Sequence, residues 1–140
     1  MKDKFIGVWK LLEMKSVSVD NIIYPLGEVV GQLIYTQDRM SAQLGSKDRP
    51  NFKSNDYREG TQSEIYSAFN SYISYFGEYE IIPDKNLVIH KVEQSLFPNW
   101  IGQNVKRYYE FKDSLLILKS TPIKYENQLL TPTLVWDKIK

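Results

Sequence analysis

The chain has no cysteine and only one histidine, His90, among its 140 residues. Without cysteine there can be no disulfide framework, no thiolate nucleophile and no cysteine-based zinc or iron–sulfur site, and this absence is typical of a reducing compartment. A single histidine argues against a transition-metal site built from protein side chains alone, although carboxylates could still hold a hard cation. We therefore expect no metal and no cofactor.

An excess of charge of one sign is also missing. The 18 lysine and arginine residues are offset by 17 aspartate and glutamate residues, and the basic residues are dispersed along the chain. We therefore expect neither nucleic acid nor a membrane as a partner. Met1–Phe5 leads straight into patterned sequence without the apolar run of a signal peptide, and no later run approaches the length of a membrane span. These features predict a cytoplasmic protein. We further expect a monomer or a weak homodimer.

Aromatic residues, in contrast, are abundant. Ten tyrosines, six phenylalanines and three tryptophans favour strands, where flat rings pack on a pleated surface. Short polar turns separate eight candidate strands and suit hairpins between sequence neighbours. The candidate strands are Phe5–Val17, Val29–Thr36, Met40–Leu44, Gly77–Ile82, Leu87–Ser95, Asn104–Phe111, Leu115–Ser120 and Leu129–Ile139. The pattern predicts one all-β domain over residues 1–140, an antiparallel up-and-down barrel of about eight strands without unpaired edges.

One segment, Thr61–Phe76, has helical rather than strand periodicity. Thr61 and Glu64 have the spacing of a capping box, and apolar residues follow at intervals of three and four. The segment predicts an inserted amphipathic helix of about four turns, lying either over the barrel mouth or on the outer wall. Large rings in the loop Phe97–Trp100 also need a surface to pack on, so we expect the loop and the helix to form or cover one entrance.

Strand alternation indicates which side chains point into the barrel. The more apolar face of Asn104–Phe111 carries Arg107, and the less charged face of Leu87–Ser95 carries His90. By the same argument Trp9 and Leu11 share a face with Glu13. The candidate ligand-binding residues are Leu33, Tyr35, Tyr79, His90, Trp100, Arg107 and Tyr109.

Motifs of known catalytic chemistry are absent. The sequence has no phosphate-binding loop, no dinucleotide-binding glycine pattern, no nucleophile elbow and no zinc-protease motif. Acid–base chemistry is what remains, with His90 or Glu93 as catalytic candidates and Tyr35, Tyr79 or Arg107 as electrostatic partners. Each candidate also has a structural alternative. His90 can be a hydrogen-bonded core residue, and Arg107 can pair with backbone carbonyls or stack on Trp9.

Several motifs resemble those of one family, the small lipocalin-like domain proteins of bacteria and fungi. Gly7-Val8-Trp9 looks like the Gly-x-Trp signature of lipocalins, and Arg107 falls where their barrel-closing arginine is expected. The more specific similarity lies in Tyr24–Gly27, Gly31–Thr36, Met40–Leu44, Asp48–Pro50, Ser95–Gly102 and Leu134–Trp136. The resemblance covers nearly the whole chain and implies a calycin-type barrel with an internal cavity. His90 matches a histidine of the family pattern.

Three functions are consistent with these features. The first is binding of a small apolar or amphipathic molecule inside the barrel. The second is a cofactor-independent isomerase or cyclase that works by acid–base chemistry in the same cavity, and the third is a structural interaction domain with a filled barrel. A cavity of about 300 Å³ or more with a few convergent polar groups would favour the first two.

Overall fold

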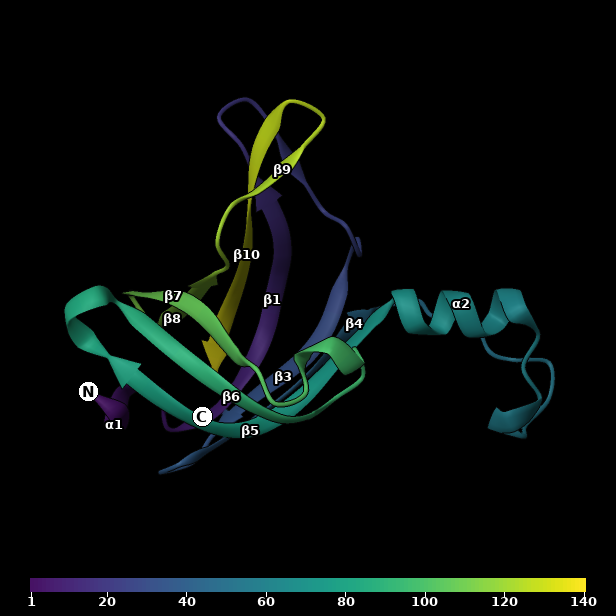
Figure 1. The fold of residues 1–140 in the computed structure, drawn as a ribbon, viewed down its shortest axis with the longest axis horizontal. Helices are drawn as coiled ribbons and strands as arrows, with labels where there is room; N and C mark the ends of the chain where they lie inside the picture. The colour runs from purple at the N-terminus through teal and green to yellow at the C-terminus, as the bar shows by residue number, and fades with distance from the viewer.

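A closed antiparallel β-barrel forms the body of the protein in the computed structural model, which describes residues 1–140 (Figure 1). Its eight strands pair with their neighbours in chain order, and pairing between the first and the last closes the barrel. They are β1 (Gly7–Val17), β3 (Val29–Tyr35), β4 (Arg39–Ser46), β5 (Tyr72–Ile82), β6 (Leu87–Ser95), β7 (Asn104–Lys112), β8 (Leu115–Lys119) and β10 (Gln128–Lys138). The predicted up-and-down barrel with one inserted helix is thus confirmed.

Two short strands extend the barrel beyond its closed wall. β2 (Ile22–Ile23) pairs with the end of β1, and β9 (Ile123–Tyr125) pairs with the start of β10. Figure 1 shows the β9–β10 hairpin rising above the rest of the barrel beside the end of β1. Neither extra strand was among the eight predicted ones, because each is only two or three residues long.

Aromatic side chains fill one end of the barrel. The short helix α1 (Lys2–Phe5) places Phe5 in the interior with no exposed surface. Its ring packs edge-on against Tyr35, Tyr109 and Phe111 at centroid distances of 5.0 to 5.3 Å. The indole N–H of Trp9 donates a hydrogen bond of 2.8 Å to the Phe5 carbonyl. Phe5 therefore plugs this end, and any space for a ligand must lie elsewhere in the barrel.

Trp9 and Glu13 of β1 have surroundings that differ from those considered from the sequence. Of the two structural alternatives for Arg107, its guanidinium bonds to the Lys106 backbone carbonyl, whereas the cation over the Trp9 ring is the ammonium group of Lys138, 5.2 Å from the ring centroid. Glu13 does not share the inner face of Trp9, because a bulge between Leu11 and Glu13 shifts the register with β10. One extra residue reverses the alternation. Met14 therefore packs against the core in place of Glu13.

The inserted helix begins as predicted but ends early. In α2 (Gln62–Asn70) the Thr61 hydroxyl accepts a hydrogen bond from the Glu64 N–H, and the Glu64 carboxylate accepts one from the Thr61 N–H. The apolar residues beyond Asn70 lie instead in β5, where Tyr72 pairs with Gly45 of β4. Cross-strand pairing has overridden the helical spacing, which short apolar runs leave ambiguous.

Helix α2 neither covers the barrel mouth nor packs on the outer wall. It has no buried residue, and it projects sideways from the barrel in Figure 1. Arg49 ties its last turn to the barrel, since the guanidinium donates hydrogen bonds of 2.9 Å to the Ser71 hydroxyl and to the Ala68 carbonyl. Neither α-helix is long and apolar enough to cross a membrane.

The substitution Gly77→Ala should destabilise the barrel strongly. Gly77 lies where the register between β5 and β6 shifts, and a Cβ atom there would lie 1.9 Å from the Lys91 carbonyl oxygen. Relieving that overlap requires backbone movement, so we expect a loss of about 1–3 kcal/mol or more in the free energy of unfolding, measured by urea denaturation. The exposed neighbour Glu78 is the control, and Glu78→Ala should stay within about 0.5 kcal/mol of the wild type. Equal stabilities for the two variants would contradict the tight strand contact at Gly77.

Candidate ligand-binding cavity

A cavity of about 200 Å³ lies inside the barrel. Ten of its fourteen lining residues are hydrophobic. The lining comprises Met14, Leu33, Ala42, Leu44, Ile73, Tyr75, His90, Trp100, Arg107, Leu118, Ser120, Pro132, Leu134 and Trp136. The cavity is smaller than the expected value of about 300 Å³. It is still large enough for one substituted aromatic ring, because an apolar cavity of about 150 Å³ can hold benzene.

His90 and two tyrosines separate this cavity from the aromatic plug. The Tyr35 hydroxyl lies 2.6 Å from His90 Nε2, and the Tyr75 hydroxyl lies 2.9 Å from His90 Nδ1. Tyr35 also contacts Phe5, whereas His90 and Tyr75 line the cavity. We call these three residues the Tyr35–His90–Tyr75 network. The network forms a polar floor between the plug and the cavity.

Burial keeps this network uncharged. Burial, assisted by the positive charge of Arg107, lowers the pKa of His90 to about 3. Burial also raises the pKa values of the Tyr35 and Tyr75 hydroxyls. At neutral pH the imidazole is therefore neutral, and both phenols keep their protons. Because both ring nitrogens of His90 already have tyrosine partners, neither is free to take a proton from a ligand.

Arg107 is the charged residue of the cavity wall. Its strand β7 alternates as predicted, with Val105 and Tyr109 buried, Arg107 half-buried on the same face, and exposed residues between them. One guanidinium nitrogen donates a hydrogen bond of 2.9 Å to the Lys106 carbonyl. No carboxylate is among the lining residues, so the cavity contains no counter-charge for this guanidinium.

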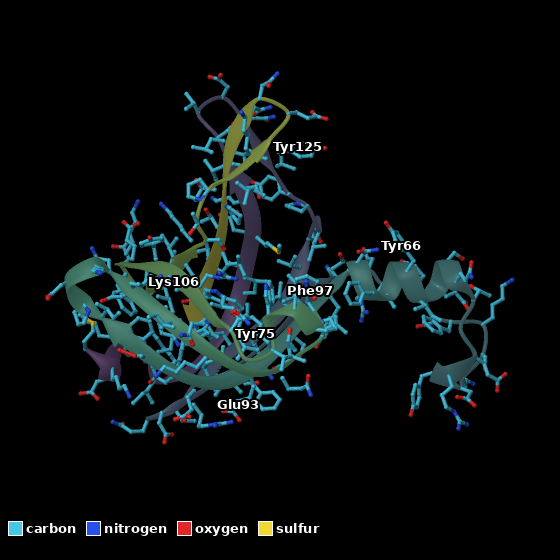
Figure 2. The ribbon with its side chains drawn as sticks, viewed as in Figure 1. Tyr66, Tyr75, Glu93, Phe97, Lys106 and Tyr125 are labelled. Atoms are coloured by element: carbon cyan, nitrogen blue, oxygen red, sulfur yellow. The ribbon has the colours of Figure 1, made fainter.

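Trp100 forms the side of the cavity where the loop before β7 approaches. It belongs to the 3₁₀ turn Pro98–Trp100, and its ring packs edge-on against Tyr75 and Phe97 at 5.4 and 5.5 Å. Trp100 and Ile73 also line a second, adjoining depression that includes Phe97 and Phe69 of helix α2. In Figure 2 Tyr75 lies within the barrel and Phe97 at its side, near the base of the projecting helix. The loop thus borders the cavity, whereas α2 reaches only the neighbouring depression.

The structure brings four of the predicted site residues together in the cavity wall, namely Leu33, His90, Trp100 and Arg107. Tyr35 lies behind the wall as a partner of His90. Tyr79 and Tyr109 are buried but do not line the cavity. The Tyr79 hydroxyl donates a hydrogen bond of 2.6 Å to the Thr36 carbonyl, and the Tyr109 hydroxyl is buried without a partner.

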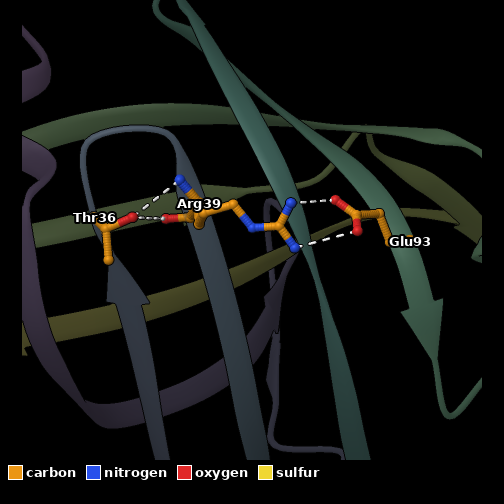
Figure 3. A network of polar contacts seen from close by, with 3 residues as sticks. All are labelled: Thr36, Arg39 and Glu93. Carbon is orange, nitrogen blue, oxygen red and sulfur yellow. Dashed lines mark hydrogen bonds and ion pairs between the residues drawn. The ribbon is translucent and has the colours of Figure 1, made fainter.

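Glu93, the other catalytic candidate, lies on the outside of the barrel. Figure 3 shows its carboxylate paired with both terminal guanidinium nitrogens of Arg39, at 2.5 and 3.2 Å. The backbone N–H of Arg39 is held by the Thr36 hydroxyl at 3.1 Å. Glu93 therefore shares no site with His90, because the alternation of β6 points the two side chains to opposite faces.

Sequence reasoning missed two ring-bearing residues of the wall, for different reasons. Tyr75 fell within the predicted helix, so it was not assigned to a strand face. Trp136 lies in a strand that was predicted, and there the alternation Leu130, Pro132, Leu134 and Trp136 marks the more apolar face. That period-two signal could have identified the β10 side of the cavity.

Comparisons with known proteins agree with this architecture. The family described as "Lipocalin-like domain" matches residues 6–139. The "4'-hydroxy-3'-methoxypropiophenone carrier protein ppsC" of Aspergillus oryzae is 31% identical to the chain over 108 residues, which span 71% of this chain and 96% of the relative. No solved structure matches the chain. The resemblance expected from the sequence motifs is confirmed.

The stability of the protein should fall as the pH is lowered from 7 to 5. Folded His90 stays neutral down to about pH 3. The histidine of the unfolded chain takes up a proton below about pH 6.5. Unfolding is therefore accompanied by proton uptake, and the free energy of unfolding should decrease by up to about 1.4 kcal/mol per pH unit below that value. Urea denaturation followed by tryptophan fluorescence measures the slope.

His90→Gln is the control, since His90 is the only histidine in the chain. The variant should be less stable at pH 7 but should lack the slope between pH 6.5 and 5, above the range in which carboxylates begin to titrate. A folded wild-type protein whose imidazole NMR signals titrate near the unperturbed value of about 6.5 would contradict the buried, neutral assignment.

Proposed function

We propose that this protein, which belongs to the lipocalin-like domain family, binds one small, largely apolar molecule in the barrel cavity. The observation that carries the proposal is the cavity itself, which has about 200 Å³ of space and ten hydrophobic residues among fourteen. A barrel packed only for stability fills its interior with side chains. The space left above the Tyr35–His90–Tyr75 network argues against a filled-barrel interaction domain.

The size of the cavity limits the ligand. Apolar walls with a few polar groups are typical of small-molecule sites. A molecule with one substituted aromatic ring matches the space, and the rings of Tyr75, Trp100 and Trp136 offer it flat surfaces. The named cargo of the Aspergillus carrier protein, 4'-hydroxy-3'-methoxypropiophenone, is a molecule of this kind. We therefore take substituted aryl ketones as the first ligands to test.

The geometry supports binding over acid–base catalysis. An isomerase or cyclase needs a base with a pKa near the working pH and a nitrogen free to reach the substrate. His90 has a pKa lowered to about 3, and both its nitrogens are engaged by tyrosines. Glu93 faces away from the cavity in its ion pair with Arg39. The cavity lining includes no carboxylate that could replace them.

The substitution Ala42→Phe should abolish ligand binding by filling the cavity. Ala42 is buried in the wall, so an added ring must enter the same space as the ligand. We expect the affinity for 4'-hydroxy-3'-methoxypropiophenone to fall by at least about tenfold, equivalent to about 1.4 kcal/mol. Isothermal titration calorimetry gives the dissociation constant, and quenching of Trp100 and Trp136 in the wall reports on the location.

Ser41→Phe is the matched control for this experiment. Ser41 precedes Ala42 in β4 and points to the opposite face, beside the exposed side chain of Phe76. The control variant adds the same ring outside the barrel and should bind like the wild type. Equal loss in both variants, or unchanged binding in Ala42→Phe with a folded circular dichroism spectrum, would exclude the barrel interior as the site.

A further inference from the structure

The Tyr35–His90–Tyr75 network has one proton more than its hydrogen bonds use. Two phenol hydroxyls and a neutral imidazole together carry three O–H or N–H protons. The two contacts of 2.6 and 2.9 Å use only two of these protons. The third proton must lie on whichever tyrosine accepts the hydrogen bond from the imidazole N–H.

Both tyrosines are buried, so contact with the cavity decides which of them holds the spare proton. If His90 donates from Nε2, the spare proton lies on Tyr35, which has 1% of its surface exposed, does not line the cavity and has no other hydroxyl partner. An unpaired donor in that position costs about 1–3 kcal/mol. If His90 donates from Nδ1, Tyr35 donates to Nε2 and the spare proton lies on Tyr75, which lines the cavity. The second arrangement leaves no donor stranded behind the wall.

Arg107 adds a second donor to the same wall. A guanidinium group can only donate hydrogen bonds. In this protein one of its nitrogens bonds to the Lys106 carbonyl, and the lining residues include no carboxylate to take the others. The polar side of the cavity therefore offers mainly hydrogen-bond donors. The Ser120 hydroxyl is the side chain in the lining that can readily accept a hydrogen bond.

We infer that the ligand presents an acceptor oxygen, of the carbonyl class, to the Tyr75 hydroxyl on the side of the cavity that contains Arg107. This inference rests on the proposed function, because it specifies the chemistry of the ligand at the same site. The apolar part of the ligand contacts the remaining wall, and the oxygen accepts a hydrogen bond from the Tyr75 hydroxyl, whose proton the network does not use. Molecules that lack this oxygen leave the Tyr75 donor unpaired when they exclude water from it.

Two isosteric probes test the inference, propiophenone and propylbenzene, which differ by a carbonyl in place of a methylene group. Propylbenzene is the more apolar molecule and would bind more tightly in a cavity without a suitable donor. We expect the opposite order in the wild type, with propiophenone bound about threefold to tenfold more tightly by calorimetry. The carbonyl stretch of bound propiophenone, labelled with carbon-13, should shift to lower frequency in the infrared spectrum.

The variant Tyr75→Phe should reverse the order of affinities and remove the infrared shift while propylbenzene still binds. Tyr79→Phe is the control, since it also removes the hydroxyl of a buried tyrosine, but one bonded to the Thr36 carbonyl outside the cavity. It should keep both the wild-type order and the shift.

Other outcomes would contradict either the inference alone or the inference together with the proposed function. Tighter binding of propylbenzene by the wild type, or an unshifted carbonyl, would overturn the inference and leave the proposed function standing. A preference that survives Tyr75→Phe would also overturn it. Failure of both probes to bind saturably would overturn the proposed function together with the inference. If Tyr75→Phe does not fold, the wild-type measurements still test the inference, because tighter binding of propylbenzene or an unshifted carbonyl would overturn it without the variant.

Discussion

The interior of this barrel depends on one buried imidazole held between two phenols. Full burial of His90 would be costly if either ring nitrogen lacked a partner, because an unsatisfied polar group in the core loses its hydrogen bonds to water. Tyr35 of β3 and Tyr75 of β5 provide the two partners, at 2.6 and 2.9 Å. The three side chains thus form the boundary between the packed end of the barrel and the cavity. On one side of them the aromatic rings around Phe5 pack edge-on against one another, and on the other side the cavity begins.

The same residues explain why the cavity is a poor setting for proton abstraction and a good one for recognition. Burial holds His90 in its neutral form, so the floor of the cavity carries no charge. Arg107 provides a positive charge at the wall without a carboxylate beside it. Such a cavity can orient a small molecule by a single polar contact with its neutral floor or its one cation. The apolar walls provide most of the binding free energy through the hydrophobic effect.

The sequence predicted the barrel well, because strand alternation and short polar turns are local signals. Leu33, His90 and Arg107 could be placed on inner faces by period-two counting alone. That counting failed at one place, where a bulge changed the phase, and it was not applied at another, where a helix was predicted. The bulge between Leu11 and Glu13 exchanged Glu13 for Met14. Tyr75 has a spacing that fits both a helix and a strand, and pairing with β4 determined the outcome. Which inward residues border empty space depends on packing across the barrel, which no single segment encodes.

The connection between β4 and β5 leaves and re-enters the barrel at nearly the same point. Gly45 pairs with Tyr72, and the Ser46 N–H donates a hydrogen bond of 2.9 Å to the Ser71 carbonyl. The hydrogen bonds between β4 and β5 therefore continue up to the point where the connection containing α2 leaves the barrel, as they would next to a short hairpin turn. Because lengthening such a loop adds little entropic cost, the excursion can gain or lose residues while the barrel stays the same. Ligand selection and the outward surface of α2 can thus diverge separately in evolution.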